Sequence, residues 1–171
     1  TVEACVFVDA SGDGILAPLS GAAHMMGRES QSQFGESLAP ANPSDACMGH
    51  SLLFQARDTG EPHTFHPYDW AYRFDSCDDM PRDTGGHKSF RMGYWWVELG
   101  GNHDIIHDTE VIKHELLRVL YGVWDHIKNR CPNRDAAATW ALEWVQFLPA
   151  KRESRRYIGA HVMTQNDIEA D

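Results

Sequence analysis

Hydrophobic residues along the chain follow two spacings, and each spacing predicts a different kind of element. Short runs rich in β-branched and aromatic residues, bounded by turn-forming residues, occupy positions 2–8, 51–57 and 90–99. Such runs are typical of β-strands, and the first of them predicts a buried strand. A further strand is expected at residues 24–29, and residues 144–165 predict strands around a basic turn.

The clearest helix signal lies at residues 109–128, where apolar residues recur at spacings of three and four and so form one stripe. The stripe consists of Val111, Ile112, Leu116, Val119, Leu120, Val123 and Ile127. Asp108 is a suitable N-cap, and Pro132 follows the expected end. Shorter helices are expected over residues 15–21 and 135–142.

Strands and helices are mixed along the chain, which predicts an α+β fold with a mixed, mainly antiparallel sheet, one long amphipathic helix and a shorter one. The 171 residues are 42% hydrophobic and 11% aromatic, enough for one globular core. Residues 62–87 form a long aperiodic segment rich in Pro, Gly, Asp and aromatic residues. Loops of this length are usually functional.

The charge and the cysteine positions narrow the classes of function. A formal net charge of −10 disfavours binding to nucleic acid or to an anionic membrane surface. The chain shows no signal peptide and no apolar run near the roughly 20 residues of a membrane span, and its localisation stays open. Cys5, Cys47, Cys77 and Cys131 form no C-x-x-C motif, which argues against a zinc ribbon or a dithiol redox motif and favours free thiols.

A histidine pair could suggest a metal site. His103 and His107 stand four residues apart, beside Asp104 and Asp108, and on a helix these groups could share one metal ion. They precede the expected helix, however, so we interpret them as polar loop and capping residues. The sequence predicts no metal site.

A glycine motif follows the first predicted strand. Residues 12–17 satisfy the dinucleotide pattern G-x-G-x-x-[GA], in which glycines let the backbone approach a pyrophosphate. Asp13 would repel that ligand, Pro18 interrupts the helix, and no second strand ending in an acid follows about 20 residues later. The motif by itself is therefore interpreted as a glycine turn between strand and helix.

A cluster of cations near the end of the chain is unusual in so acidic a protein. Lys151, Arg152, Arg155 and Arg156 surround Glu153. Side chains alternate between the faces of a strand, so the four cations cannot all point the same way. Some of them could bind an anion, a carboxylate or a partner domain, and a solvated face with local ion pairs is the alternative.

Two adjacent tryptophans, Trp95 and Trp96, fall on opposite faces of a predicted strand. One of them can therefore pack in the core while the other is exposed. An exposed tryptophan beside polar groups suits stacking on a sugar ring or a flavin. Core packing is the alternative for either side chain.

Several of these segments, taken in order, resemble a bacterial family of FAD-dependent oxidoreductases, some of whose members carry a xanthan-lyase-related label. The resemblance rests on residues 7–14, 27–29, 93–98, 121–129 and 151–156, and it runs over nearly the whole chain. Ser11 stands where the family usually has threonine, and it keeps the hydroxyl group.

The resemblance implies a two-domain flavoprotein of which this chain is the substrate-domain portion. Residues 1–21 would return from the FAD-binding domain, and residues 22–171 would form the inserted substrate domain. The N-terminal Rossmann unit and a C-terminal closing segment would lie outside the chain. The full-length protein, and not this chain alone, would hold FAD, so the isolated chain is expected to be inactive. Its partners would be that FAD-binding domain and a small-molecule substrate, and an uncovered docking surface could drive a homodimer.

The resemblance also implies roles for individual residues. The cofactor-binding residues would be Ser11, Gly12, Asp13 and Gly14. The catalytic residues would be Arg152, Arg155 and Glu153. The substrate would contact Trp95, Trp96, Lys151 and Arg156. The implied reaction is hydride transfer between FAD and a small substrate, for which a saccharide derivative is one candidate. The alternative is a saccharide-binding or saccharide-active domain, a lyase or hydrolase, that works without flavin.

Overall fold

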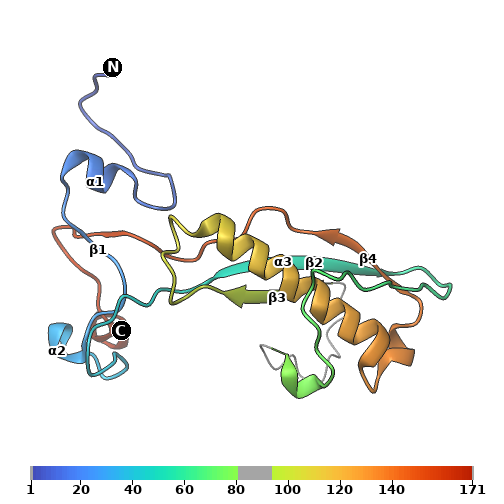
Figure 1. The fold of residues 1–171 in the computed structure, drawn as a ribbon. Helices are drawn as coiled ribbons and strands as arrows, with labels where there is room; N and C mark the ends of the chain where they lie inside the picture. Colours follow the sequence, from blue (N-terminus) through green and yellow to red (C-terminus); the bar gives the residue numbers. More distant parts are fainter. Residues whose placement is uncertain (1, 81–93, 171) are drawn as a thin grey trace. The chain divides into compact units, whose positions relative to one another are not determined.

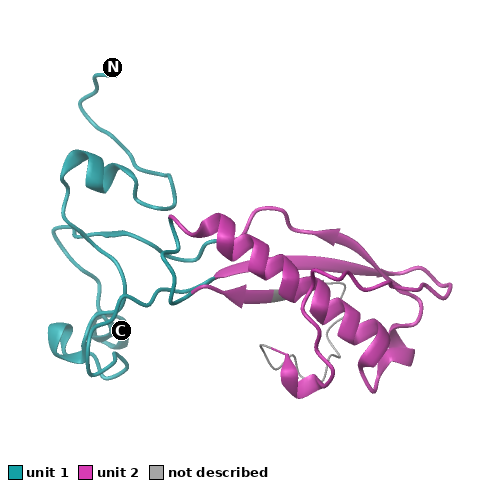
Figure 2. Cartoon of the chain, viewed as in Figure 1, with its two compact units in different colours: residues 1–49, 101–106, 151–171 teal, residues 50–100, 107–150 magenta. Residues whose placement is uncertain are grey.

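The computed structural model describes residues 2–80 and 94–170, with only the backbone described at residues 94–96 (Figure 1). The chain divides into two compact units, which Figure 2 colours separately. Unit 1 comprises residues 1–49, 101–106 and 151–171. Unit 2 comprises residues 50–100 and 107–150.

Unit 2 is built on a three-stranded antiparallel sheet. Its strands are β2 (His50–Asp58), β3 (Tyr94–Leu99) and β4 (Trp140–Val145), in the order β3-β2-β4. A β-bulge interrupts the register of β2 with β4 between Gln55 and Ala56. The prediction of a strand at residues 51–57 is confirmed. That for residues 90–99 is confirmed from Tyr94 on, and residues 90–93 lie outside the described part.

The long helix α3 (Thr109–Asp125) packs against β2 and β3 and buries most of the predicted apolar stripe. The centre of this core is the pair Phe54 and Trp124, whose rings meet edge to face with centroids 5.8 Å apart. The predicted helix over residues 109–128 is thus confirmed, with one difference. Its last turn is not α-helical, because the π-helix η3 (His126–Arg130) continues from α3.

The prediction of a helix over residues 135–142 is wrong for its second half. The short 3-10 helix η4 (Arg134–Ala137) is followed by β4, where the helix was expected to continue. Trp140 and Leu142 lie opposite β2 residues and pack against the core. Pairing with β2 therefore outweighs the helix propensity of the alanine-rich segment.

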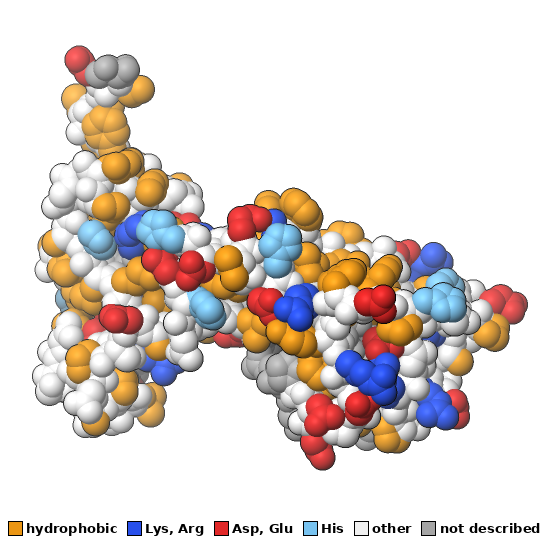
Figure 3. Space-filling view, in the orientation of Figure 1, with side chains coloured by type: hydrophobic (Ala, Val, Ile, Leu, Met, Phe, Trp, Pro, Cys, Tyr) orange, Lys and Arg blue, Asp and Glu red, His pale blue; other side chains and the backbone are white. Residues whose placement is uncertain are grey.

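The start of the chain also differs from its prediction. Residues 2–8 form no strand, and their apolar side chains are on the surface: Val2 is 80% exposed and Val8 is 82% exposed (Figure 3). No other described strand pairs with this stretch, so the hydrogen bonds that would hold it as a strand are not made. The next element, α1 (Leu16–Ser20), confirms the expected short helix and ends at Gly21 with φ 76°.

Unit 1 contains short elements joined by loops. Strand β1 (His24–Met25) pairs antiparallel with β5 (Arg156–Tyr157), so the strands expected within residues 24–29 and 144–165 are short. The helices α2 (Gln31–Phe34) and α4 (Gln165–Glu169) complete the unit. Together the two units confirm the α+β class with antiparallel sheets. Among the described residues, no helix has the length and apolar character needed to cross a membrane.

Candidate functional site

The candidate site lies in unit 1, where the loop of residues 9–14 meets residues 151–157. Lys151 donates a hydrogen bond from Nζ to Asp13 Oδ2 at 2.7 Å, across 138 residues of sequence. The guanidinium of Arg155 donates to the Asp13 carbonyl oxygen at 3.1 Å. The buried Ser154 donates from Oγ to the Gly12 carbonyl oxygen at 3.4 Å. The structure thus joins the predicted cofactor loop to part of the predicted basic cluster.

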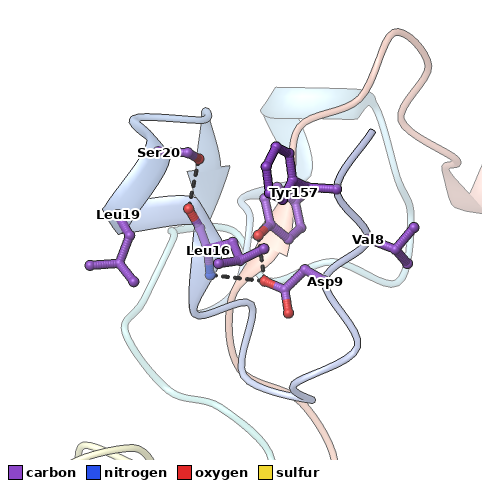
Figure 4. Close-up of a pocket in the computed structure, with 7 residues that line it drawn as sticks. Val8, Asp9, Leu16, Leu19, Ser20 and Tyr157 are labelled. Carbon is purple, nitrogen blue, oxygen red and sulfur yellow. Dashed lines mark hydrogen bonds between the residues drawn. The ribbon is translucent and has the colours of Figure 1, made fainter. Parts of the chain in front are cut away.

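Asp9 organises the start of this loop through four hydrogen bonds, of which Figure 4 draws those from Leu16 and Tyr157. Its Oδ1 accepts from the N–H of Ser11 at 2.9 Å and from the Ser11 hydroxyl at 2.7 Å. Its Oδ2 accepts from the N–H of Leu16 at 2.9 Å and from the Tyr157 hydroxyl at 2.5 Å. The Ser11 hydroxyl also accepts from the N–H of Ile15 at 3.1 Å, so it ties the loop to the entry of α1.

These hydrogen bonds give a pH-dependent prediction for Asp9. They hold the pKa of its carboxyl well below the usual 3.8, and the bond from Tyr157 is the largest cause. The network therefore stabilises the loop above pH 3.8, and this contribution is lost as the pH falls through the folded-state pKa. The substitution Tyr157→Phe should raise the Asp9 pKa toward 3.8, measured by NMR titration of the carboxyl carbon.

Asp58, in unit 2, is the control for this titration. Its pKa is also lowered, by hydrogen bonds from Thr139 and from the N–H of Gly60. The pKa of Asp58 should not change in the Tyr157→Phe variant. An unchanged Asp9 pKa in that variant would contradict the network.

The two glycines of the loop have different physical roles. Gly12 has φ 84°, and a Cβ built on it would meet no atom within 4 Å. Its backbone conformation needs glycine, and its Cα faces open space. Gly14 has φ 57°, and a Cβ there would lie 3.2 Å from Arg155 Cβ and 3.5 Å from Tyr157 Cε2. Gly14 therefore permits the close approach of the two segments.

The loop also keeps unused hydrogen-bonding groups. The backbone N–H groups of Gly12, Asp13 and Gly14 donate to no atom of the described residues, and the buried Asp13 Oδ1 has no partner there. Burial raises the pKa of Asp13, but hydrogen bonds from Lys151 and Ser154 and the charges of Lys151 and Arg155 lower it overall. Asp13 is therefore a carboxylate whose charge is compensated, which weakens its repulsion of an anionic ligand.

A cavity of about 650 Å³ opens beside this loop (Figure 4). Its walls are mostly apolar, and they are formed by Phe7, Val8, Asp9, Leu16, Leu19, Ser20 and Tyr157. Small-molecule sites in proteins have volumes of roughly 300–1,000 Å³. The cavity is therefore large enough for part of an organic cofactor or substrate.

The other predicted site residues are placed differently. The Glu153 carboxylate accepts from the N–H of Met48 at 3.2 Å. The Arg156 guanidinium donates to the Gly27 carbonyl at 2.7 Å and to the Glu29 carboxylate at 2.8 Å. Both residues thus contact parts of unit 1 outside the loop of residues 9–14. Arg152 is exposed.

The predicted aromatic contacts belong to another part of the chain. Trp95 and Trp96 lie on β3 of unit 2, opposite Phe54 and Leu53 of β2, and their side chains lie outside the described part of the structure. Sequence reasoning missed Asp9 and Tyr157, because their contact depends on the pairing of two-residue strands that carry no local signal. Asp9 does stand inside the motif that carries the family resemblance.

Comparison with known protein families identifies the family of the chain. The family described as FAD dependent oxidoreductase matches residues 1–171. The chain belongs to this family. Among curated proteins and solved structures, no significant match is found. Membership in the FAD-dependent oxidoreductases supports a flavoprotein type of activity, with FAD as the cofactor of the full-length protein.

The candidate loop of this FAD-dependent oxidoreductase fits a flavin cofactor in three respects. Three consecutive N–H groups are available to acceptor oxygens. The Gly12 backbone is open to close approach. Lys151 and Arg155 supply positive charge at the loop.

Proposed function

We propose that this chain forms the substrate-facing side of a flavin-dependent oxidoreductase that transfers a hydride between a small substrate and FAD. The observation that carries the proposal is the contact of the loop of residues 9–14 with Lys151 and Arg155. In this proposal FAD is held mainly by a separate FAD-binding domain of the complete protein. The exposed apolar side chains of residues 2–8 support a docking role for that stretch.

The cationic segment, residues 151–156, would bind negatively charged groups of the flavin and of the substrate. When bound, FAD supplies the hydride donor or acceptor. Lys151 and Arg155 lie at the loop, and their positive charge would favour a cofactor or substrate that carries negative charge there. The exposed Arg152 would orient a carboxylate or oxyanion of the substrate. A saccharide derivative remains the proposed substrate class by family resemblance alone.

The first test is flavin retention. The visible absorption spectrum of the complete protein and of this chain would be recorded after addition of FAD and removal of the excess. We expect a flavin band on the complete protein and none on this chain. A complete protein without flavin would overturn the proposal.

The second test asks what the cationic segment does. In the complete protein, Arg152→Ala and Arg155→Ala should depress turnover while FAD stays bound. Lys151→Met and Arg155→Ala should also make the flavin midpoint potential more negative by about 30 mV, which corresponds to 1.4 kcal/mol for a two-electron couple. The control is Arg57→Ala, which removes a cation that pairs with Glu143 in unit 2. Unchanged turnover and potential would contradict the assigned roles.

One observation favours saccharide binding without flavin as a second candidate function. In unit 2 the rings of Tyr68 and Trp70 are stacked, with centroids 5.3 Å apart, and each side chain is 48% exposed. Tyr121 meets the Trp70 ring edge-on at 5.2 Å. Exposed, mutually fixed aromatic faces suit stacking on sugar rings.

The saccharide alternative makes its own prediction. This chain, without flavin, should then bind oligosaccharides saturably, as measured by tryptophan fluorescence. Trp70→Ala should weaken the binding up to about tenfold, because an aromatic contact contributes about 0.5–1.5 kcal/mol. Absence of saturable binding would rule this candidate out.

A further inference from the structure

A group of potential metal-ligand atoms lies in unit 2 and includes no residue of the candidate site. Cys77, His126 and Cys131 each offer one ligand atom, and these atoms all lie within 4.8 Å of one another. His126 and Cys131 are buried, and Cys77 is half-buried. Cys77 begins the short helix η1 (Cys77–Asp79). The other two residues bracket the π-helix η3, so the group joins a loop to the end of the long helix.

The histidine ring is oriented as in a metal ligand. His126 Nδ1 lies 2.9 Å from the carbonyl oxygen of Phe74. A carbonyl oxygen only accepts, so Nδ1 carries a proton. Nε2 lies 3.4 Å from Cys77 Sγ and so faces the thiol group. Metal-binding histidines typically donate their second ring N–H to a backbone carbonyl in this way.

The π-helical turn brings the second thiol to the same place. The N–H of Cys131 donates to the carbonyl of His126 at 2.7 Å, a bond that spans five residues. On an α-helix, residues five apart point about 140° away from each other, because each residue turns the chain by about 100°. The wider π turn places His126 and Cys131 on the same side. Such turns occur frequently at functional sites.

The spacing of the three ligand atoms matches that around a zinc ion. Zinc bonds of about 2.3 Å to sulfur and about 2.0–2.1 Å to nitrogen, in tetrahedral geometry, separate sulfur from nitrogen by about 3.6 Å and two sulfurs by about 3.8 Å. The Cys77–His126 separation of 3.4 Å is close to the first value, and all separations are below 4.8 Å. Thiolate and imidazole ligands together favour Zn²⁺ over the harder divalent cations.

We propose that Cys77, His126 and Cys131 bind a zinc ion and fasten the loop of residues 74–79 to the end of α3. Three protein ligands leave a fourth coordination position, which water can occupy. The half-buried Cys77 gives the ion a path of entry. The sequence alone predicts no metal site, because the ligands are 49 and five residues apart and follow no common zinc motif.

The test uses the full chain, reduced and freed of metal. Zn²⁺ alone is titrated against a chromogenic chelator, and Co²⁺ alone is used as a spectroscopic substitute. We expect one metal ion per chain, with thiolate-to-cobalt charge-transfer bands and the intense d–d bands of tetrahedral cobalt. Cys77→Ser should weaken zinc binding at least a hundredfold.

Cys5→Ser is the matched control, because Cys5 is an exposed free cysteine. It should bind zinc as the unchanged chain does. Cys77 is the preferred variant since it is only half-buried, and circular dichroism would confirm that the variant stays folded. Three outcomes would overturn the proposal: no zinc binding by the reduced chain, equal loss in the two variants, or a Cys77–Cys131 disulfide in a chain that binds no zinc once reduced.

Discussion

The substitution Gly27→Ala is expected to destabilise unit 1 by at least about 2 kcal/mol. Gly27 has φ 81°, a conformation that costs other residues roughly 1–2 kcal/mol. A Cβ at this position would also lie 2.3 Å from the carbonyl oxygen of Ser44. That carbonyl cannot move freely, because it accepts from the N–H of Arg28 at 2.7 Å. The added methyl group must therefore break the Arg28–Ser44 pairing.

The Gly27→Ala change would be measured by hydrogen exchange of the Arg28 and Ser44 amides, which reports on unit 1 directly. Gly35→Ala is the matched control, because Gly35 has φ 71° but open space where the Cβ would be. It should show the conformational cost alone. Equal effects of the two substitutions would show that the contact with Ser44 is unimportant. The Gly27 carbonyl oxygen also accepts a hydrogen bond from the Arg156 guanidinium. The Gly27→Ala variant therefore also tests whether this hydrogen bond supports the candidate site.

The substitution Lys128→Met is expected to destabilise unit 2 by about 2–3 kcal/mol. The ammonium group of Lys128 donates to the carbonyl oxygens of Ala137, Ala138 and Trp140 at 2.7, 3.0 and 2.8 Å. These carbonyls end η4 and begin β4, where the chain changes from helix to strand. Methionine fills a similar volume but leaves the three acceptors without this donor. Hydrogen bonds to a charged group contribute about 1.5–3 kcal/mol.

Denaturant unfolding, followed by tryptophan fluorescence, would measure the Lys128→Met effect. Arg57→Met is the control, because it removes a cation from the same unit whose exposed ion pair with Glu143 contributes at most about 1 kcal/mol. Similar destabilisation by both substitutions would assign the effect to net charge and contradict the role of the three carbonyls.

The fold was predictable where local periodicity decides it. The helix at residues 109–128 and the strand at residues 51–57 follow from the spacing of apolar residues. Prediction failed where pairing over long distances decides the structure. Residues 2–8 have strand composition but no described partner strand, and the alanine-rich segment before Trp140 gives way to pairing with β2. Local propensity carries no information about either outcome.

The candidate site was predictable in its parts but not in its assembly. The glycine turn and the basic cluster were both visible in the sequence, and family resemblance linked them to a flavin. Two contacts of the site join residues more than a hundred positions apart, Asp9 with Tyr157 and Asp13 with Lys151. A local sequence pattern cannot predict such contacts. The Cys77, His126 and Cys131 group depends on a π-helical turn, which apolar periodicity does not predict.

The discontinuous composition of unit 1 has a consequence for the order of events during synthesis. The loop of residues 9–14 leaves the ribosome before its partner Lys151, which is made 138 residues later. Unit 2 lies between them in sequence, and its Ser51 and Ala150 exchange two backbone hydrogen bonds, at 3.0 and 2.8 Å. Once unit 2 folds, its two chain ends are therefore held together, which removes most of the entropy cost of closing the long loop. Folding of unit 2 therefore brings residues 151–157 close in the chain to the loop of residues 9–14, so that the hydrogen bonds between the two segments can form.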